Sequence, residues 1–266
     1  PQDLLALRQV TGKASDRRET HLSEIFLSDT LVWKLKRAVR LPYVDFSTPG
    51  LRKAACEREV ELNRVMAPQI YRGIRNITRR GDAGLEFDGG GPLVDCAVEM
   101  VRFDEAGLFD RLADMGRLDG QIIDQAADAI LAFHARLPPL PPDGAGLMAN
   151  VLEINRQGFA QSGLFSTEEQ EELTRRFRDS LRALAPDLTR RGQIGRVRLC
   201  HGDLHLRNIC LLDGVPLLFD RLEFNDSIAT VDVLYDLAFL AMDLWHRDLP
   251  GLANRLSLPF VRTLAV

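Results

Sequence analysis

The sequence has few features that would direct a chain to a membrane, to nucleic acid or out of the cell. No apolar run reaches the roughly 18 residues that a transmembrane helix needs, and the first twenty residues lack the continuous apolar core of a signal peptide. Lysine and arginine number 34 against 38 aspartate and glutamate, a formal net charge of −4, so nucleic-acid binding through bulk positive charge is not expected. We therefore expect a cytoplasmic protein that contacts neither membrane nor nucleic acid.

Cysteine is scarce, and its spacing excludes two kinds of site. The four cysteines contain no C-x-x-C pair, which argues against a zinc site and against a disulfide framework. We expect them to be small buried hydrophobic residues in a reducing compartment. They are Cys56, Cys96, Cys200 and Cys210.

Glycine is missing where a phosphate-binding loop would use it. None occurs between Gly12 and Gly50, and the motif G-x-x-x-x-G-K-[ST] is absent from the chain. The second absence excludes a P-loop ATPase domain within these residues. If phosphates are covered near the N-terminus, side chains of Thr20, His21 and Ser23 must supply the donors.

The first hundred residues are predicted to form mostly strands. A short helix at Leu4–Val10 and a polar loop come first. A helix is predicted to begin at Ser47 or Thr48, where Pro49 follows, and to end at Met66 before Pro68. The expected strands, rich in β-branched and aromatic residues, are Ser23–Ser28, Leu31–Lys36, Tyr71–Thr78, Leu85–Phe87 and Leu93–Phe103.

The remaining residues are predicted to be mainly helical, with one embedded strand-rich stretch over Val197–Leu212 and Val215–Phe219. The expected helices are Leu108–Met115, Asp119–Arg136, Asn150–Gln161, Thr167–Leu184 and Val231–Leu244. This order predicts an α+β protein with a small antiparallel-sheet lobe at residues 1–103 and a larger, mostly helical lobe at residues 104–266. The cleft between the lobes is the expected site.

The strongest chemical signal is the segment His201-Gly-Asp-Leu-His-Leu-Arg-Asn208. Transfer of a phosphoryl group to an alcohol needs a carboxylate that orients the hydroxyl and oxygen ligands that hold Mg²⁺. Asp203 and Asn208, five residues apart, can supply both within one loop. Asp220 follows twelve residues later at the end of an apolar strand, and the turn at Asp213-Gly214 keeps it near Asn208.

These residues resemble the catalytic core of the aminoglycoside phosphotransferase and choline kinase group, which has the protein-kinase-like fold. More narrowly, the chain resembles bacterial aminoglycoside-phosphotransferase-like proteins that are often fused to a P-loop ATPase domain. The sequence segments that match these proteins span nearly the whole chain. They are Glu19–Ser23, Trp33–Lys36, Leu41–Ser47, Cys56–Asn63, Cys200–Asn208, Phe219–Asp220 with Glu223–Phe224, and Tyr235–Leu240.

The resemblance implies a role for each of several residues. Asp203 would be the catalytic base, with Asn208 and Asp220 as metal ligands and Glu223 as a further ligand or a partner of Arg221. A strand lysine would hold the phosphates: Lys34 and Lys36 both qualify, and we prefer Lys34. Its glutamate partner would be Glu59 in preference to Glu57 or Glu61. Backbone groups near Met100, Arg102 and Phe103 would hold adenine.

Four more residues are assigned from their sequence context. His201 is expected to stabilise the catalytic loop by hydrogen bonding. Asp236 is expected to brace that loop or cap a helix, and His134 to be a core histidine. His205 is open to either a structural or a substrate-binding role.

The leading hypothesis is an ATP- and Mg²⁺-dependent phosphotransferase that acts on a hydroxyl of a small molecule. One alternative is a protein Ser/Thr kinase, which the short interval between Asp220 and the next helix disfavours. The other is a non-catalytic module that binds a P-loop ATPase domain or partner. The acceptor cannot be read from these residues.

Overall fold

The structure, a computed structural model, describes residues 16–41, 43–81, 84–140 and 143–264. The chain forms two compact units, which we describe separately. The sheet unit comprises Pro1–Gln125 and Leu206–Asn225, and the helical unit comprises Ala126–His205 and Asp226–Val266. No helix among the described residues is long and apolar enough to cross a membrane. The boundary near residue 103 stays a prediction.

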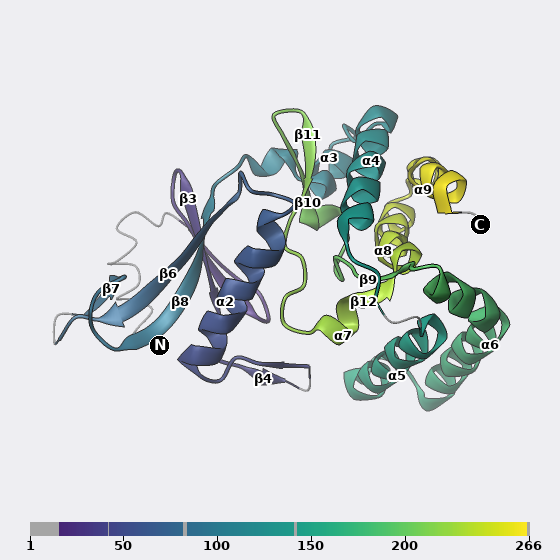
Figure 1. The fold of residues 1–266 in the computed structure, drawn as a ribbon, viewed down its shortest axis with the longest axis horizontal. Helices are drawn as coiled ribbons and strands as arrows, with labels where there is room; N and C mark the ends of the chain where they lie inside the picture. Colours follow the sequence, from purple (N-terminus) through teal and green to yellow (C-terminus); the bar gives the residue numbers. More distant parts are fainter. Residues whose placement is uncertain (1–15, 42, 82–83, 141–142, 265–266) are drawn as a thin grey trace. The chain divides into compact units, whose positions relative to one another are not determined.

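The sheet unit is built on six antiparallel strands in the order β1-β2-β3-β8-β6-β7 (Figure 1). The strands are β1 (Asp16–Glu19), β2 (Ser23–Leu27), β3 (Leu31–Lys36), β6 (Tyr71–Arg79), β7 (Leu85–Phe87) and β8 (Leu93–Val101). A turn at Asp29-Thr30 joins β2 to β3. There the Ser28 N–H donates to the Leu31 carbonyl at 2.8 Å. The expected antiparallel-sheet region is therefore confirmed.

One prediction in this region is wrong. The sequence predicts a polar loop up to residue 20, whereas Asp16–Glu19 forms β1 and pairs with β2. All four side chains of β1 are exposed, so the strand lacks the apolar alternation that would reveal it. The predicted helix at Leu4–Val10 lies outside the described residues.

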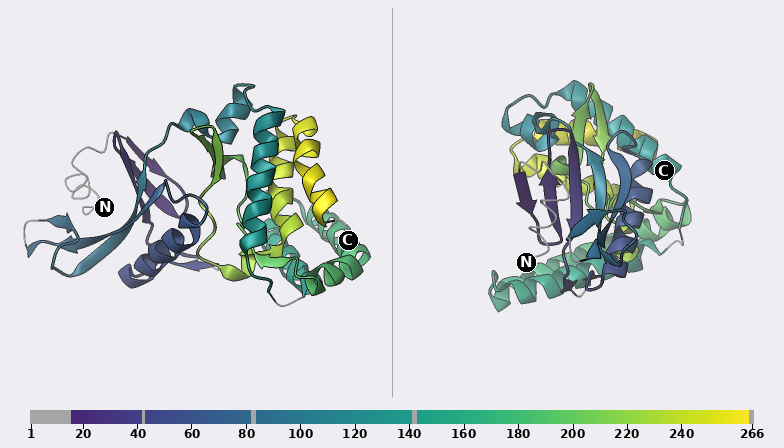
Figure 2. Two further views of the ribbon diagram at one scale, coloured as in Figure 1. Left: turned by 45° about the horizontal axis from the view of Figure 1, so that its top comes forward. Right: turned by 90° about the vertical axis from the view of Figure 1, so that its left-hand side faces the viewer.

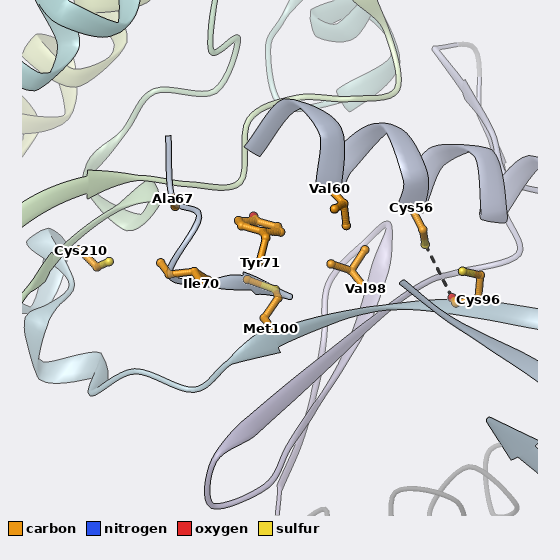
Figure 3. Close-up of a cluster of buried hydrophobic side chains, with 9 residues drawn as sticks. All are labelled: Cys56, Val60, Ala67, Ile70, Tyr71, Cys96, Val98, Met100 and Cys210. Atoms are coloured by element: carbon orange, nitrogen blue, oxygen red, sulfur yellow. Dashed lines mark hydrogen bonds between the residues drawn. The ribbon is translucent and has the colours of Figure 1, made fainter. Parts of the chain in front are cut away.

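Helix α2 (Pro49–Arg64) covers one face of the sheet and packs on β8 and β6. Thr48 caps it, because its hydroxyl accepts the Leu51 N–H at 3.3 Å, and Pro49 occupies the first turn as predicted. Figure 3 shows the apolar cluster between α2 and the sheet, including Val60, Tyr71 and Val98. This core fixes which face of α2 points toward β3.

The rest of the sheet unit is short elements and one hairpin. They are β4 (Arg40–Leu41), β5 (Val44–Asp45), the 3-10 helix η2 (Glu105–Gly107), α3 (Phe109–Asp114), the 3-10 helix η3 (Leu206–Asn208), β10 (Ile209–Leu212) and β11 (Val215–Leu218). The β10–β11 turn has positive φ at Asp213 (51°) and Gly214 (77°), as a two-residue hairpin turn requires. Helix α4 (Gly120–Arg136) runs from the sheet unit into the helical unit.

The helical unit contains two helix pairs and a small two-stranded sheet. Helix α5 (Gly144–Ser162) packs on α6 (Thr167–Gln193), and α8 (Val233–His246) lies beside α9 (Pro250–Leu264), as Figure 2 shows. Between these pairs in the sequence, β9 (Val197–Leu199) pairs antiparallel with β12 (Thr230–Asp232), which follows α7 (Asp226–Ala229).

The helical unit differs from the sequence prediction at three element ends. Helix α6 continues beyond Leu184 and through Pro186, whose missing N–H costs one hydrogen bond without stopping the helix. Helix α5 begins earlier than predicted, because Asp143 caps it ahead of the glycine-containing first turn. The predicted helix from Val231 begins at Val233, because Thr230–Asp232 pairs with β9.

Candidate functional site

Lys34 and Lys36 lie on the same face of β3, as their spacing of two predicts. The alternating residues Trp33 and Leu35 point to the opposite face and pack in a second apolar cluster. Both lysines are buried, with side-chain exposures of 11% for Lys34 and 2% for Lys36. A buried ammonium group needs a charged partner, so the next question is what faces them.

Glu59 of α2 contacts both lysines, one with each carboxylate oxygen. The distance from Glu59 Oε1 to Lys34 Nζ is 3.0 Å, and that from Oε2 to Lys36 Nζ is 2.6 Å. Glu59 itself is completely buried. Of the three glutamates that compete in the sequence, Glu57 and Glu61 have exposed side chains and pair with other residues on α2.

The segment after β11 adds two more carboxylates. Lys34 forms an ion pair with Asp220, and Lys36 forms one with Glu223. Glu223 is buried, whereas 37% of the Asp220 side chain is exposed. With every group ionised, two ammonium groups face three carboxylates, so the cluster has one surplus negative charge and its exposed member is Asp220.

The proton affinities in this cluster reflect both burial and pairing. Burial alone would lower the pKa of Lys34, but the charges of Asp220, Glu59 and Glu223 raise it well above its ordinary value. The pKa of Lys36 is raised in the same way by Glu59 and Glu223 against the effect of burial. Burial raises the pKa of Glu223, although Lys36 opposes the shift. Both lysines therefore stay charged at neutral pH.

Tyr71 and Asn63, for which the sequence predicts no role, bind the backbone N–H groups of residues 220 and 221. The Tyr71 hydroxyl accepts the Asp220 N–H at 3.1 Å, and Asn63 Oδ1 accepts the Arg221 N–H at 2.8 Å. Tyr71 and Asn63 are both buried. Asn63 is the last residue of the matching segment Cys56–Asn63. Nothing in a single sequence indicates that its side-chain amide accepts a hydrogen bond from Arg221, 158 residues away.

Asp220 adopts a left-handed backbone conformation, with φ of 60°. A non-glycine residue in this region is uncommon and is held there by its surroundings, here the bonds from Tyr71 and Asn63 to the backbone N–H groups of residues 220 and 221. Asn208 lies on the same hairpin, since its carbonyl accepts the Phe219 N–H at 3.0 Å. Asn208 is also buried.

The residues expected to hold adenine follow β8. Met100 is buried, and its side chain belongs to the apolar cluster under α2 (Figure 3). The Arg102 N–H donates to the Thr30 carbonyl at 2.9 Å, and its guanidinium donates to the Ser28 carbonyl at 2.7 Å. The Phe103 ring packs edge-on against Phe219, with centroids 5.5 Å apart.

The turn between β1 and β2 carries the residues that the sequence predicts as phosphate donors in the absence of a glycine-rich loop. Thr20 Oγ1 accepts the Ser23 N–H at 2.9 Å, and the Thr20 N–H donates to the Ser23 carbonyl at 2.8 Å. Arg37 donates to the Thr20 carbonyl at 3.0 Å. Hydrogen bonds thus fix this turn without glycine.

In the helical unit, Asp236 of α8 braces the loop that begins at His201. Its carboxylate accepts the backbone N–H of Gly202 at 2.9 Å and that of His201 at 3.2 Å. His134 Nε2 lies 2.8 Å from the same carboxylate. The expectation that Asp236 supports the loop is confirmed, and His134 is a buried core histidine, as predicted.

Asp236 binds these partners as a carboxylate. Burial alone would raise its pKa, but the hydrogen bond and charge of His134, the nearby His201 and the Gly202 N–H together lower it. His201 is completely buried, whereas the Asp203 side chain is half exposed. His205 Nε2 lies 3.5 Å from the Asp203 carboxylate. The loop therefore presents Asp203 outward while its start is held inside.

The structure thus brings together, within the sheet unit, five of the predicted residues: Lys34, Lys36, Glu59, Asp220 and Glu223. Asn208 belongs to the same unit, whereas His201 and Asp203 belong to the helical unit. The four cysteines are buried, as predicted, and no disulfide bond joins them.

The phosphotransferase enzyme family model (APH) matches residues 32–257. The chain belongs to this family. The match begins within β3 and ends within α9, so it includes Lys34, Glu59 and the segment from His201 to Glu223. The resemblance to the aminoglycoside phosphotransferase family is therefore confirmed.

Curated relatives include uncharacterised proteins of Mycobacterium tuberculosis (strain H37Rv) and Mycobacterium bovis. Each is 29% identical over 248 residues, which is 86% of this chain and 45% of the relative. This phosphotransferase family member thus spans about half the length of the curated relatives it matches.

Solved structures with the same fold include aminoglycoside phosphotransferases. The enzyme APH(3'')-Id from Streptomyces rimosus, in complex with ADP and streptomycin, is 19% identical with a TM-score of 0.52, over 97% of this chain and 89% of that chain. APH(4)-Ia is 14% identical with a TM-score of 0.52, over 97% and 81% of the two chains. At these identities the likeness supports the two-lobed phosphotransferase fold.

Proposed function

We propose that this chain binds ATP with Mg²⁺ and transfers the γ-phosphate to a hydroxyl group of a small molecule. The observation that carries the proposal is the buried Lys34–Glu59 pair with Asp220 beside it, in a chain of the phosphotransferase enzyme family. The solved relative that holds ADP and streptomycin supports a nucleotide and a small hydroxylated acceptor.

The cluster suits a cation and a phosphate because of its charges. Its surplus negative charge and the exposed Asp220 carboxylate favour a hard cation such as Mg²⁺, which takes oxygen ligands. Asp220 and Asn208 are the residues proposed to hold it. Bound Mg²⁺ would neutralise charge on the phosphates.

Each protein group has a separate proposed task. Lys34, kept charged and held by Glu59, binds the phosphates. Asp203 orients the acceptor hydroxyl and accepts its proton. Asp236 acts through the loop backbone by fixing the N–H groups of His201 and Gly202. Backbone groups near Arg102 and Phe103 are proposed to bind adenine.

The test of this function is ADP release with ATP and Mg²⁺ against a panel of aminoglycosides, sugars, amino alcohols and nucleosides. We expect one acceptor class to stimulate release, and Lys34→Met to reduce kcat/KM for ATP by about 100-fold or more, since the lysine contributes charge stabilisation in the transition state. Lys53→Met, on the exposed side of α2, is the control and should retain wild-type activity.

The two alternative functions predict different results. Stimulation by protein substrates alone would favour a protein Ser/Thr kinase. ATP binding without release across the whole panel would favour a regulatory module for a P-loop ATPase partner.

A further inference from the structure

The buried cluster contains a second lysine–carboxylate pair that the proposed chemistry does not use. Lys36 and Glu223 have side-chain exposures of 2% and 5%, against 11% for Lys34 and 37% for Asp220. The Lys36–Glu223 pair is therefore less exposed to solvent than the Lys34–Asp220 pair. A group buried to this degree and already engaged by a neighbour is poorly placed to exchange that neighbour for a ligand.

The contacts of Glu59 connect the two pairs. One of its oxygens binds Lys34 and the other binds Lys36, so the carboxylate is fixed at both ends. Lys36 in turn binds Glu223, and Asn63 binds the backbone of Arg221. Lys36 and Asn63 thus attach the segment 220–223 to β3 and α2 independently of Lys34.

The proposed function requires the first pair to open. Lys34 contacts Asp220 directly, and this contact must break for Lys34 to bind phosphate and Asp220 to bind a metal ion. Without another attachment, Glu59 could rotate and the segment could move when the pair separates. The Lys36 contacts with Glu59 and Glu223 involve neither Lys34 nor Asp220.

We propose that Lys36 is a positioning residue, which binds Glu59 and Glu223 so that Glu59 stays aligned with Lys34 and Asp220 stays in place while Lys34 and Asp220 separate. Glu223 is thereby a partner of Lys36 and not a metal ligand. This inference rests on the proposed function of the same site.

Charge counting identifies the informative variants. Lys36→Met leaves three carboxylates with one lysine, which destabilises the buried cluster. The double variant Lys36→Met/Glu223→Gln removes one charge of each sign, so it restores the original surplus while still leaving Glu59 Oε2 without its lysine. Loss of stability caused by the extra negative charge can therefore be distinguished from loss of ligand binding caused by a misplaced Glu59.

The experiment measures binding of Mn²⁺ with a non-hydrolysable ATP analogue, by electron paramagnetic resonance of free Mn²⁺, next to urea unfolding of the same proteins. We expect the double variant to recover stability relative to Lys36→Met, yet to bind the Mn²⁺–analogue complex about 10- to 100-fold more weakly than wild type, the usual effect of losing an outer-shell partner. Lys36→Arg should restore most of the binding. Lys53→Met is the control and should bind as wild type does.

Several results would overturn the inference. If binding recovers together with stability in the double variant, Lys36 is only structural. If Glu223→Gln loses Mn²⁺ as Asp220→Asn does, Glu223 is a metal ligand. If the wild type binds neither Mn²⁺ nor the analogue, the proposed function fails as well, whereas wild-type binding with an unaffected Lys36→Met contradicts the inference alone.

Discussion

Among single residues, Glu59 is the carboxylate that contacts both lysines of the site. It is fully buried and shared between Lys34 and Lys36. Burying a carboxylate is unfavourable unless it is paired, and here each oxygen has its own ammonium group. The same arrangement keeps both lysines protonated, so the charge that would bind phosphate is present before any ligand arrives.

Removal of the Glu59 charge should therefore destabilise the fold. We expect Glu59→Gln to lower the free energy of unfolding by about 1–3 kcal/mol, because it weakens two fully buried contacts, with Lys34 and with Lys36. Asp220 and Glu223 still balance the charges of the two lysines in this variant. Glu57→Gln, on the exposed side of the same helix, should change it by less than about 1 kcal/mol. Urea unfolding at pH 7.5 measures both, and equal effects would contradict the assignment.

Asp236 makes a separate, pH-dependent contribution. Its pKa is lowered in the folded protein, so the stability it provides is present above its unfolded pKa and is lost as the pH falls through the folded value. Below about pH 4 the unfolding free energy of Asp236→Asn should therefore depend less on pH than that of the wild type. Urea unfolding between pH 2.5 and 6 tests this, and parallel curves would show that Asp236 is not held as a carboxylate.

The placement of a side chain could be predicted from the sequence where it depends only on neighbouring residues in the same strand or helix. The same-face placement of Lys34 and Lys36 follows from strand alternation alone. The contacts of Asn63 and Tyr71 with residues 220 and 221 could not be predicted, because they join segments about 150 residues apart through neutral side chains. The catalytic roles of Asp203 and Asn208 stay predictions.

Helix and strand boundaries were predicted correctly where residues close in the sequence determine them. The helix start at Ser47 or Thr48 and the turn at Asp213-Gly214 were predicted because capping and turn residues act within four positions, and Thr48 is the N-cap. Strand β12 was missed, because its three residues form a strand only by pairing with β9. Helix α6 was predicted too short, since it continues through Pro186, whose missing N–H removes only one hydrogen bond.

The β10–β11 turn provides a test at this scale. Gly214 has φ of 77° and open space around its Cα, so Gly214→Ala meets no clash but must adopt a left-handed conformation. We expect a loss of about 1–2 kcal/mol in unfolding free energy. Gly50→Ala, in the first turn of α2 and also in open space, should be neutral or stabilising by up to about 1 kcal/mol. Equal losses would show that the turn conformation is not maintained in solution.

For the whole molecule, the α+β class and the family were predicted from sequence, and the family match confirms both. The acceptor was not, because phosphotransfer needs the same carboxylates and lysine whatever hydroxyl receives the phosphate. The mycobacterial relatives are about twice as long as the part that this chain matches. The function proposed above concerns the residues of this chain and does not extend to the additional residues of those longer relatives.

The most direct test of the central claim is transfer of the γ-phosphate by wild type and by Asp203→Ala, each at saturating ATP and Mg²⁺ with the acceptor found in the panel. We predict that the variant binds ATP as the wild type does and loses acceptor-dependent ADP release by about 100-fold or more, the scale of a missing general base. An Asp203→Ala protein that retains wild-type transfer would contradict the account.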